Sequence, residues 1–208
     1  MSFQATFLEQ PTTPLLELST LEEVKALLEF EDNVRDVVLM KLIKDVSAEV
    51  EMYLNRSTAV VTDAIQYFDI PRYGVKMFLR AYPITTVTSL WNTTDRTYDS
   101  TTIVDSDNYY VDTQHGIITV DKQYLLMGAG AVKLQYTGGM ASNTANFIRD
   151  YRALSSALAT EVMYRFQRNA EIGLIAASGG GSNVTLERRL QFHPSVQIVL
   201  QEHRRMTS

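Results

Sequence analysis

The sequence predicts an α+β fold in which two long helices form a helical core, with short helices near the ends of the chain and an antiparallel β insertion in the middle. Three observations predict it. Apolar residues recur with the helical period of about 3.6 from Val34 to Leu54, and again from about residue 144 to 170. Between these stretches the period changes to two, as in half-buried strands. The length of 208 residues suits one domain, or one domain with a large insertion.

The first elements are an arm and a short helix. Residues 1–18 contain two prolines and little periodicity, so we expect an extended arm. Segment 18–23 (LSTLEE) places Ser19 and Thr20 three residues before a pair of glutamates, which is the pattern of a capping box at a helix start. We therefore predict a short helix that ends near Phe30.

The long helix Val34–Leu54 contains no Gly or Pro, and at about 1.5 Å per residue it forms a rod of about 30 Å. Asp32 or Asn33 is expected to cap it, and segment 55–57 (NRS) to close it. One side carries charged residues, whereas the other is an apolar stripe that must pack against another element. The stripe consists of Val38, Leu39, Leu42, Ile43, Val46, Val50, Tyr53 and Leu54.

The middle of the chain has the period of two and frequent turn residues, which predict a small antiparallel sandwich or barrel-like insertion. Residues 92–107 are expected to form a long polar loop, with at most a short strand at Thr102–Val104. Six strands are predicted: Ala64–Ile70, Lys76–Arg80, Thr86–Trp91, Tyr109–Asp112, Ile117–Val120 and Ala131–Thr137.

Helix returns from about Thr144 to Ala170, and this helix is the natural partner of Val34–Leu54. Ile172–Val184 carries no charge and has three consecutive glycines, which favours flexibility. A last short helix is predicted at Ser195–Arg205. The chain is thus read as one domain, 1–208, with a helical core (19–57 and 144–170), a β insertion (58–140) and a flexible, partner-binding C-terminal segment (171–208).

Composition excludes several classes of protein. The absence of cysteine excludes disulfides, thiolate metal sites and cysteine catalysis. No apolar run approaches the roughly 20 residues that span a membrane, and the N-terminus lacks a signal-peptide pattern. The net charge of −5 does not favour binding to nucleic-acid phosphates.

Charge is distributed unevenly along the chain. Residues 1–55 contain 4 basic and 11 acidic side chains, whereas residues 146–208 contain 8 basic and 5 acidic ones. An acidic front and a basic rear favour head-to-tail association between copies of the chain. Scattered charges on solvated faces are the alternative interpretation.

No motif points to catalysis, a metal or a cofactor. The three histidines lack a partner at metal-ligand spacing on the same element, and we expect His115 to lie at the surface. Gly179–Ser182 lacks the Lys-Ser/Thr of a phosphate-binding loop. Gly138-Gly139 lacks the pattern of a nucleophile elbow and is interpreted as a strand-to-helix turn. We expect no enzyme activity and no cofactor.

The order of several motifs resembles a known family. Segment 18–28 (LSTLEEVKALL), an acidic break and a long helix ending in 50–56 (VEMYLNR) resemble the opening of tailed-bacteriophage head-to-tail connector proteins, also called head-completion or adaptor proteins. Segment 79–90 (LRAYPITTVTSL) is similar to a strand, proline and strand of that family. Segment 132–139 (VKLQYTGG) resembles its last strand and double-glycine exit, and helix 148–168 stands where the family has its second long helix. The resemblance covers about residues 18–170.

This resemblance implies a structural role without catalysis. Such proteins form a ring, typically of twelve copies, beneath the portal protein in the virion neck. The ring extends the DNA channel and offers a docking platform to the stopper or tail protein. DNA would pass through the channel without specific binding, and no membrane would be involved. The protein would be made in the host cytoplasm.

The C-terminal segment is the expected portal-binding site, because an apolar stripe followed by arginines comes after a glycine stretch. The alternative is that this helix packs on the chain's own core. The rival functions are a stopper or tail-completion protein and, in another class, a small ligand- or glycan-binding β module with Trp91, Tyr109 and Tyr110 as its stacking platform. The expected portal-binding residues are Phe192, Val196, Val199, Leu200, Arg204 and Arg205.

Overall fold

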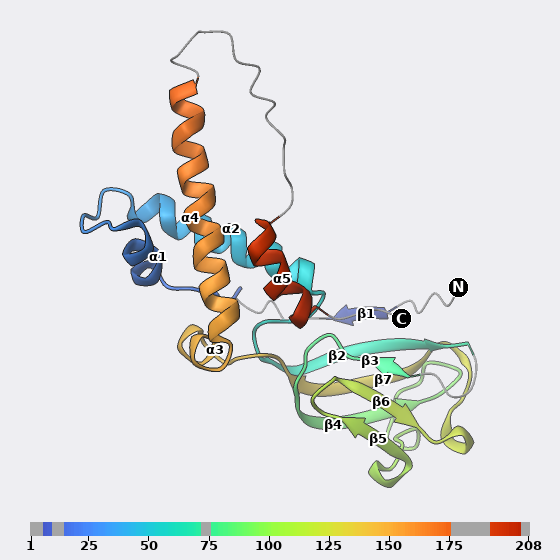
Figure 1. Cartoon of the computed structure of the whole chain (residues 1–208). Helices are drawn as coiled ribbons and strands as arrows, with labels where there is room; N and C mark the ends of the chain where they lie inside the picture. Colours follow the sequence, from blue (N-terminus) through green and yellow to red (C-terminus); the bar gives the residue numbers. More distant parts are fainter. Residues whose placement is uncertain (1–5, 10–14, 72–75, 176–191, 205–208) are drawn as a thin grey trace. The chain divides into compact units, whose positions relative to one another are not determined.

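The computed structural model describes residues 6–9, 15–71, 76–175 and 192–204. The chain divides into two compact units (Figure 1). Unit 1 comprises residues 1–14 and 56–142 and contains the strands, whereas unit 2 comprises residues 15–55 and 143–208 and contains the helices. The predicted α+β class is confirmed.

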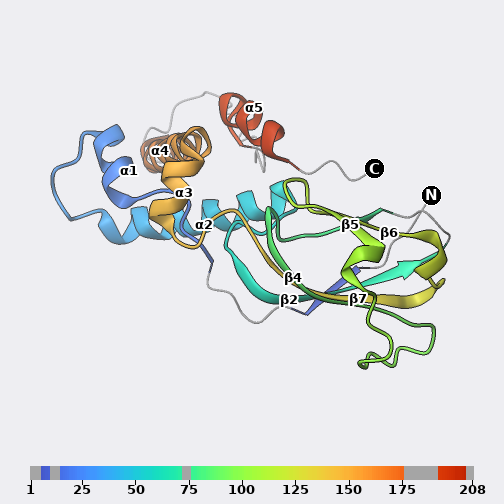
Figure 2. The ribbon, with the colours of Figure 1, turned by 90° about the horizontal axis from the view of Figure 1, so that it is seen from below.

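Unit 2 is built around α4, which packs against α1, α2 and α5. Figures 1 and 2 both show α1 beside the N-terminal end of α2 and α5 nearer its C-terminal end. The buried stripes of α2 and α4 carry Leu, Ile and Val at helical spacing, as the sequence predicts. The helices are α1 (Leu21–Leu28), α2 (Asp36–Leu54), α3 (Thr144–Asp150), α4 (Arg152–Ile175) and α5 (Pro194–His203).

The start of α1 has the predicted N-cap at Thr20, whereas Glu23 contacts the Ser19 hydroxyl and not the backbone N–H of the cap residue. The Thr20 hydroxyl accepts a hydrogen bond from the backbone N–H of Glu23 at 3.2 Å, and the Ser19 hydroxyl donates to the Glu23 carboxylate at 3.1 Å. These contacts satisfy a backbone donor that the first helical turn leaves without a partner.

The start of α2 differs from the prediction. Its N-cap is Arg35, whose side chain makes no capping hydrogen bond. Asp32 instead accepts from the backbone N–H of Val34, and Asn33 accepts from the Lys25 ammonium. Both side chains therefore stabilise the α1–α2 loop (residues 29–35). Val38, which the sequence placed on the buried stripe, is 52% exposed.

The predicted helix from Thr144 to Ala170 is two helices, because the backbone at Tyr151 leaves helical geometry (φ −126°, ψ 45°). The Tyr151 ring stacks on Phe147, with ring centroids 5.4 Å apart, and meets His203 edge-on at 6.2 Å. The helix breaks here although the sequence has no Gly or Pro at this point. The residue at the break, Tyr151, contacts α5, which lies about fifty residues further along the chain. The second helix continues to Ile175, beyond the predicted end.

Unit 1 contains two antiparallel sheets with strand orders β1-β2-β7-β4 and β3-β6-β5. All six predicted strands are present, although β3 is reduced to two residues and Ile103 forms only an isolated bridge with Trp91. The N-terminal arm contributes a strand that the sequence did not predict. The strands are β1 (Thr6–Glu9), β2 (Val61–Ile70), β3 (Met77–Phe78), β4 (Ile84–Asn92), β5 (Tyr109–Asp112), β6 (Ile117–Val120) and β7 (Gly128–Gly138).

Gly138-Gly139 lies at the end of β7, the last strand of unit 1. Neighbouring backbone atoms lie so close to both residues that only glycine fits. A Cβ at Gly138 would lie 2.5 Å from the Ala81 carbonyl oxygen, and one at Gly139 would lie 2.2 Å from that of Ala59. Gly139 also has φ +140°, which side chains rarely adopt. The pair is the predicted turn. No helix in the described part of the chain is long and apolar enough to cross a membrane.

Candidate functional site: the C-terminal helix and its anchorage

Local sequence fixes the start of α5, the expected portal-binding helix. Pro194 occupies the first helical turn, where its missing N–H is no loss. His193 is the N-cap, and its Nδ1 accepts a hydrogen bond from the backbone N–H of Ser195 at 3.4 Å. The Gln197 side chain donates to the carbonyl oxygen of Phe192 at 2.8 Å, so the residue before the cap is also held.

The apolar side of α5 is buried within unit 2. Phe192, Val196 and Leu200 are 6%, 1% and 0% exposed, and Val199 is half-buried. The ring of Phe192 meets Tyr53 of α2 edge to face, with centroids 5.5 Å apart. The structure thus brings these apolar residues together as an anchor of α5.

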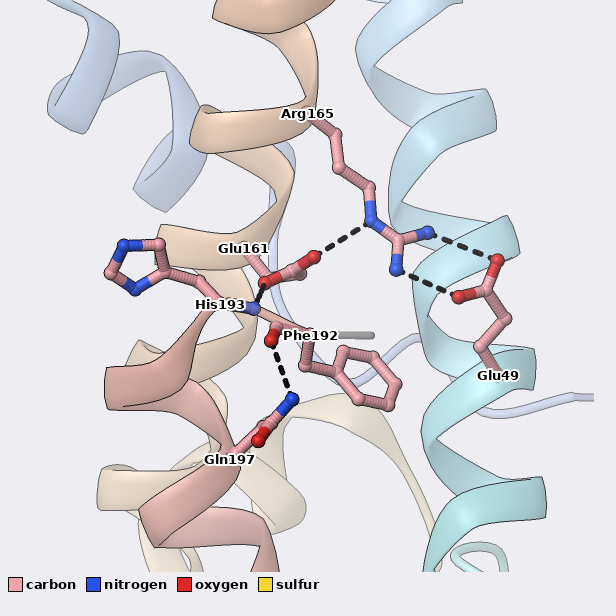
Figure 3. A network of polar contacts seen from close by, with 6 residues as sticks. All are labelled: Glu49, Glu161, Arg165, Phe192, His193 and Gln197. Atoms are coloured by element: carbon pink, nitrogen blue, oxygen red, sulfur yellow. Dashed lines mark hydrogen bonds and ion pairs between the residues drawn. The ribbon is translucent and has the colours of Figure 1, made fainter. Parts of the chain in front are cut away.

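A network of polar side chains from α2 and α4 holds the start of α5 (Figure 3). The Glu161 carboxylate of α4 accepts from the backbone N–H of His193 at 2.8 Å and from the Arg165 Nε at 2.8 Å. The two Arg165 Nη atoms donate to the carboxylate of Glu49 on α2 at 3.0 and 2.7 Å. One carboxylate, almost completely buried, therefore joins α5 to α4, and Arg165 connects it to α2.

The electrostatics of this network favour the charged form of Arg165. Burial alone would lower the pKa of Arg165, but the hydrogen bonds with Glu49 and Glu161 outweigh it, and the pKa is raised above its ordinary value. The guanidinium also lies 5.6 Å from the centroid of the Phe192 ring, so the network covers the apolar anchor.

The outer side of α5 remains at the surface. Ile198 is 63% exposed, and the exposed Arg204 places its guanidinium 4.9 Å from the Tyr53 ring centroid. Arg205, the last of the expected portal-binding residues, lies outside the described residues. The expected set is therefore divided between a buried anchor and an exposed arginine.

The sequence reasoning missed the charged members of this site. Glu161 and Arg165 are four residues apart on one helix, a spacing that itself favours an ion pair. That signal was available in the sequence. No local pattern links either of them to Glu49, which lies 116 residues from Arg165.

Of the remaining candidate sites, Gly179–Ser182 lies outside the described residues. His115 is at the surface, as predicted, and its ring lies 2.8 Å from the Asp112 carboxylate. Backbone and side-chain hydrogen bonds from His115 hold the pKa of Asp112 below its usual value. Among the described residues, no group of three His, Asp or Glu side chains could hold a metal ion.

The aromatic residues proposed as a stacking platform belong to two different sheets. Trp91 belongs to the four-stranded sheet, and the Lys133 ammonium lies 4.9 Å from its ring centroid. Tyr109 and Tyr110 belong to the other sheet and alternate, so Tyr109 packs on the core whereas Tyr110 is exposed. Tyr109 and Tyr110 therefore do not share one side of their sheet.

Comparison with known proteins gives two findings. A family model described as head completion protein matches residues 17–206, and no curated protein matches the chain. A chain in the neck of an empty gene transfer agent (GTA) particle, computed with C6 symmetry, has a TM-score of 0.58 and 16% sequence identity, with 97% of each chain covered.

Two further solved chains have the same fold. One, from the neck of a native GTA particle computed with C12 symmetry, has a TM-score of 0.52 and 16% identity, with 97% of each chain covered. The other, from the virion of a native GTA particle, has a TM-score of 0.53 and 14% identity, with 97% of this chain and 96% of that chain covered. At such identities the likeness shows the fold.

Proposed function

The chain belongs to the head completion protein family, and on that premise we propose that it is a ring-forming adaptor between the portal protein and the stopper or tail. As a head completion protein it is a structural component of the virion, in the neck between head and tail. The observation that carries the proposal is the family match, which extends over residues 17–206 and therefore includes most of both units. The role involves no catalysis.

The proposed ring has twelve copies. Similar chains occur in GTA necks computed with C6 and C12 symmetry, and either symmetry is compatible with twelve copies around one axis. The ring would extend the DNA channel of the portal. A chain with a net charge of −5 would let DNA pass without binding tightly, because phosphates are repelled.

We propose that the C-terminal segment contacts the portal. Phe192, Val196 and Leu200 would hold α5 in place, and the exposed side of α5 with Arg204 would meet the portal, with the half-buried Val199 at the edge of the contact. Arg205, which follows in the sequence, is proposed to add a second positive charge. The variant Arg204→Glu/Arg205→Glu separates these roles, because it leaves the buried anchor intact. It should weaken portal binding, whereas equal binding by the variant would refute this placement.

The first experiment is the mass of the purified protein by light scattering, over a concentration series and with portal protein added. An adaptor gives a ring-sized species, either alone or on the portal. A protein that binds no portal but joins an assembled portal–adaptor complex would be a stopper. A monomer that binds neither the portal nor the portal–adaptor complex would refute the adaptor proposal. The ligand-binding β module would then be the function to test.

A further inference from the structure

The α1–α2 loop and the first turn of α2 present apolar side chains that nothing in the described chain covers. Val34, Val37 and Val38 are 84%, 75% and 52% exposed. They lie within five consecutive residues and form what we call the valine patch. Single exposed apolar residues are normal, but adjacent ones on a helix end favour a protein contact.

The charges around the valine patch are mainly acidic. Glu29, Glu31 and Asp32 are exposed and form no ion pair within the described residues. Of the nearby cations, Lys25 is paired with Asp36 at 2.9 Å, whereas Arg35 is exposed and its guanidinium lies 4.5 Å from the Phe30 ring centroid, so within the described chain three unpaired acids outnumber one unpaired cation. A partner that fits this surface therefore presents an apolar group next to a positive charge.

This chain carries such a surface on α4. Thr160, Tyr164 and Arg168 follow one another at intervals of four residues and share one side of the helix, which we call the Tyr164 face. Tyr164 and Arg168 are exposed, and Arg168 forms no ion pair within the described residues. The single acidic residue between Arg152 and Arg168 is the buried Glu161, so the exposed side is positive.

The two surfaces lie on opposite sides of α4 in one copy. Phe166 meets Phe30 of the α1–α2 loop, with ring centroids 5.6 Å apart, so this side of α4 faces the loop. Tyr164 and Arg168 are each two residues from Phe166, which is about 200° around a helix. Tyr164 accordingly stacks on His193, on the side of α5, at 4.0 Å.

We propose that the valine patch and its acidic rim bind the Tyr164 face of a neighbouring copy of this chain. Because the two surfaces differ and point apart, the contact is head-to-tail and continues from copy to copy until a ring closes. The inference rests on the proposed ring and identifies the surfaces that build it. The valines cover Tyr164, and Glu29 and Glu31 face Arg168.

A charge exchange tests this pairing. Variant A is Glu29→Arg/Glu31→Arg, and variant B is Gln167→Glu/Arg168→Glu; all four positions are exposed. In each variant alone, like charges face each other at every contact between copies. The association constant for ring assembly should therefore fall on the order of tenfold at low salt. In an equal mixture every contact joins opposite charges again, and an alternating ring of A and B should form.

The matched control is Asp107→Arg/Asp121→Arg, which changes two exposed acids of unit 1 and the net charge by the same amount as variant A. Rings are measured by light scattering and electron microscopy, with and without portal protein. Rings that form in the mixture but not from A or B separately would support the pairing. Normal rings from A or B, loss of rings in the control, or no rings in the mixture would refute the pairing without refuting the proposed adaptor function. Absence of wild-type rings both alone and on the portal would refute both.

Discussion

The inner side of α5 and the valine patch are built from the same kinds of residue but have opposite environments. Val196 and Leu200 are 1% and 0% exposed, and a buried carboxylate fixes the start of their helix. Val34 and Val37 are 84% and 75% exposed and nothing in the described chain covers them. An apolar helix side therefore indicates a contact but does not identify whether its partner belongs to the same copy or to another.

The largest expected effect comes from emptying the α5 anchor. Leu200→Ala removes a completely buried side chain, and the lost burial and the remaining cavity should destabilise unit 2 by about 2–5 kcal/mol. Chemical denaturation of the purified protein measures this change. Ile198→Ala, on the exposed side of the same helix, is the control and should have little effect on stability. An unchanged unfolding midpoint for Leu200→Ala would mean that α5 is not anchored as described.

A smaller effect is expected from the polar network. Glu161→Ala leaves the backbone N–H of His193 without its acceptor, which should cost about 1–3 kcal/mol. Hydrogen exchange of the α5 amides, compared with wild type, should show faster opening of this helix. Glu49→Ala removes the half-exposed end of the network and should cost less than about 1 kcal/mol. Equal effects of the two variants would contradict a specific role of Glu161 in holding α5.

The smallest effect on stability is expected from a substitution in the valine patch, because its side chains are exposed in one copy. Val37→Ser changes an exposed side chain, so the unfolding free energy should stay within about 0.5 kcal/mol of wild type. Ring assembly should nevertheless weaken, because the apolar contact between copies is lost. Thermal unfolding and light scattering on the same sample separate the two effects. A strong loss of stability without loss of assembly would place Val37 in the interior of its own copy.

Local sequence patterns were sufficient for much of the fold. The N-cap at Thr20, the helix end at Asn55 and the turn at Gly138-Gly139 are all where the sequence predicts them. The two helix ends depend on a few neighbouring residues, because caps act within one turn of chain, whereas the two glycines are also required by the distant Ala59 and Ala81 carbonyls. The strands of unit 1 were likewise recognisable from alternation and β-branched residues.

Features that depend on distant residues were missed. The break at Tyr151 involves His203, and the salt bridge of Arg165 involves Glu49. The strand β1 exists because the N-terminal arm pairs with β2, about sixty residues away in sequence. In each case the partner lies too far along the chain for periodicity to reveal it.

The class of fold, most helix and strand positions and the resemblance to head completion proteins were evident from the sequence, because periodicity, caps and turns are local properties. Which apolar surfaces are covered became evident only from the folded chain. The folded chain buries Phe192, Val196 and Leu200 and leaves Val34 and Val37 exposed. The physical reason is that burial depends on which elements meet in space, and the same amphipathic pattern fits a partner within the chain or in another copy.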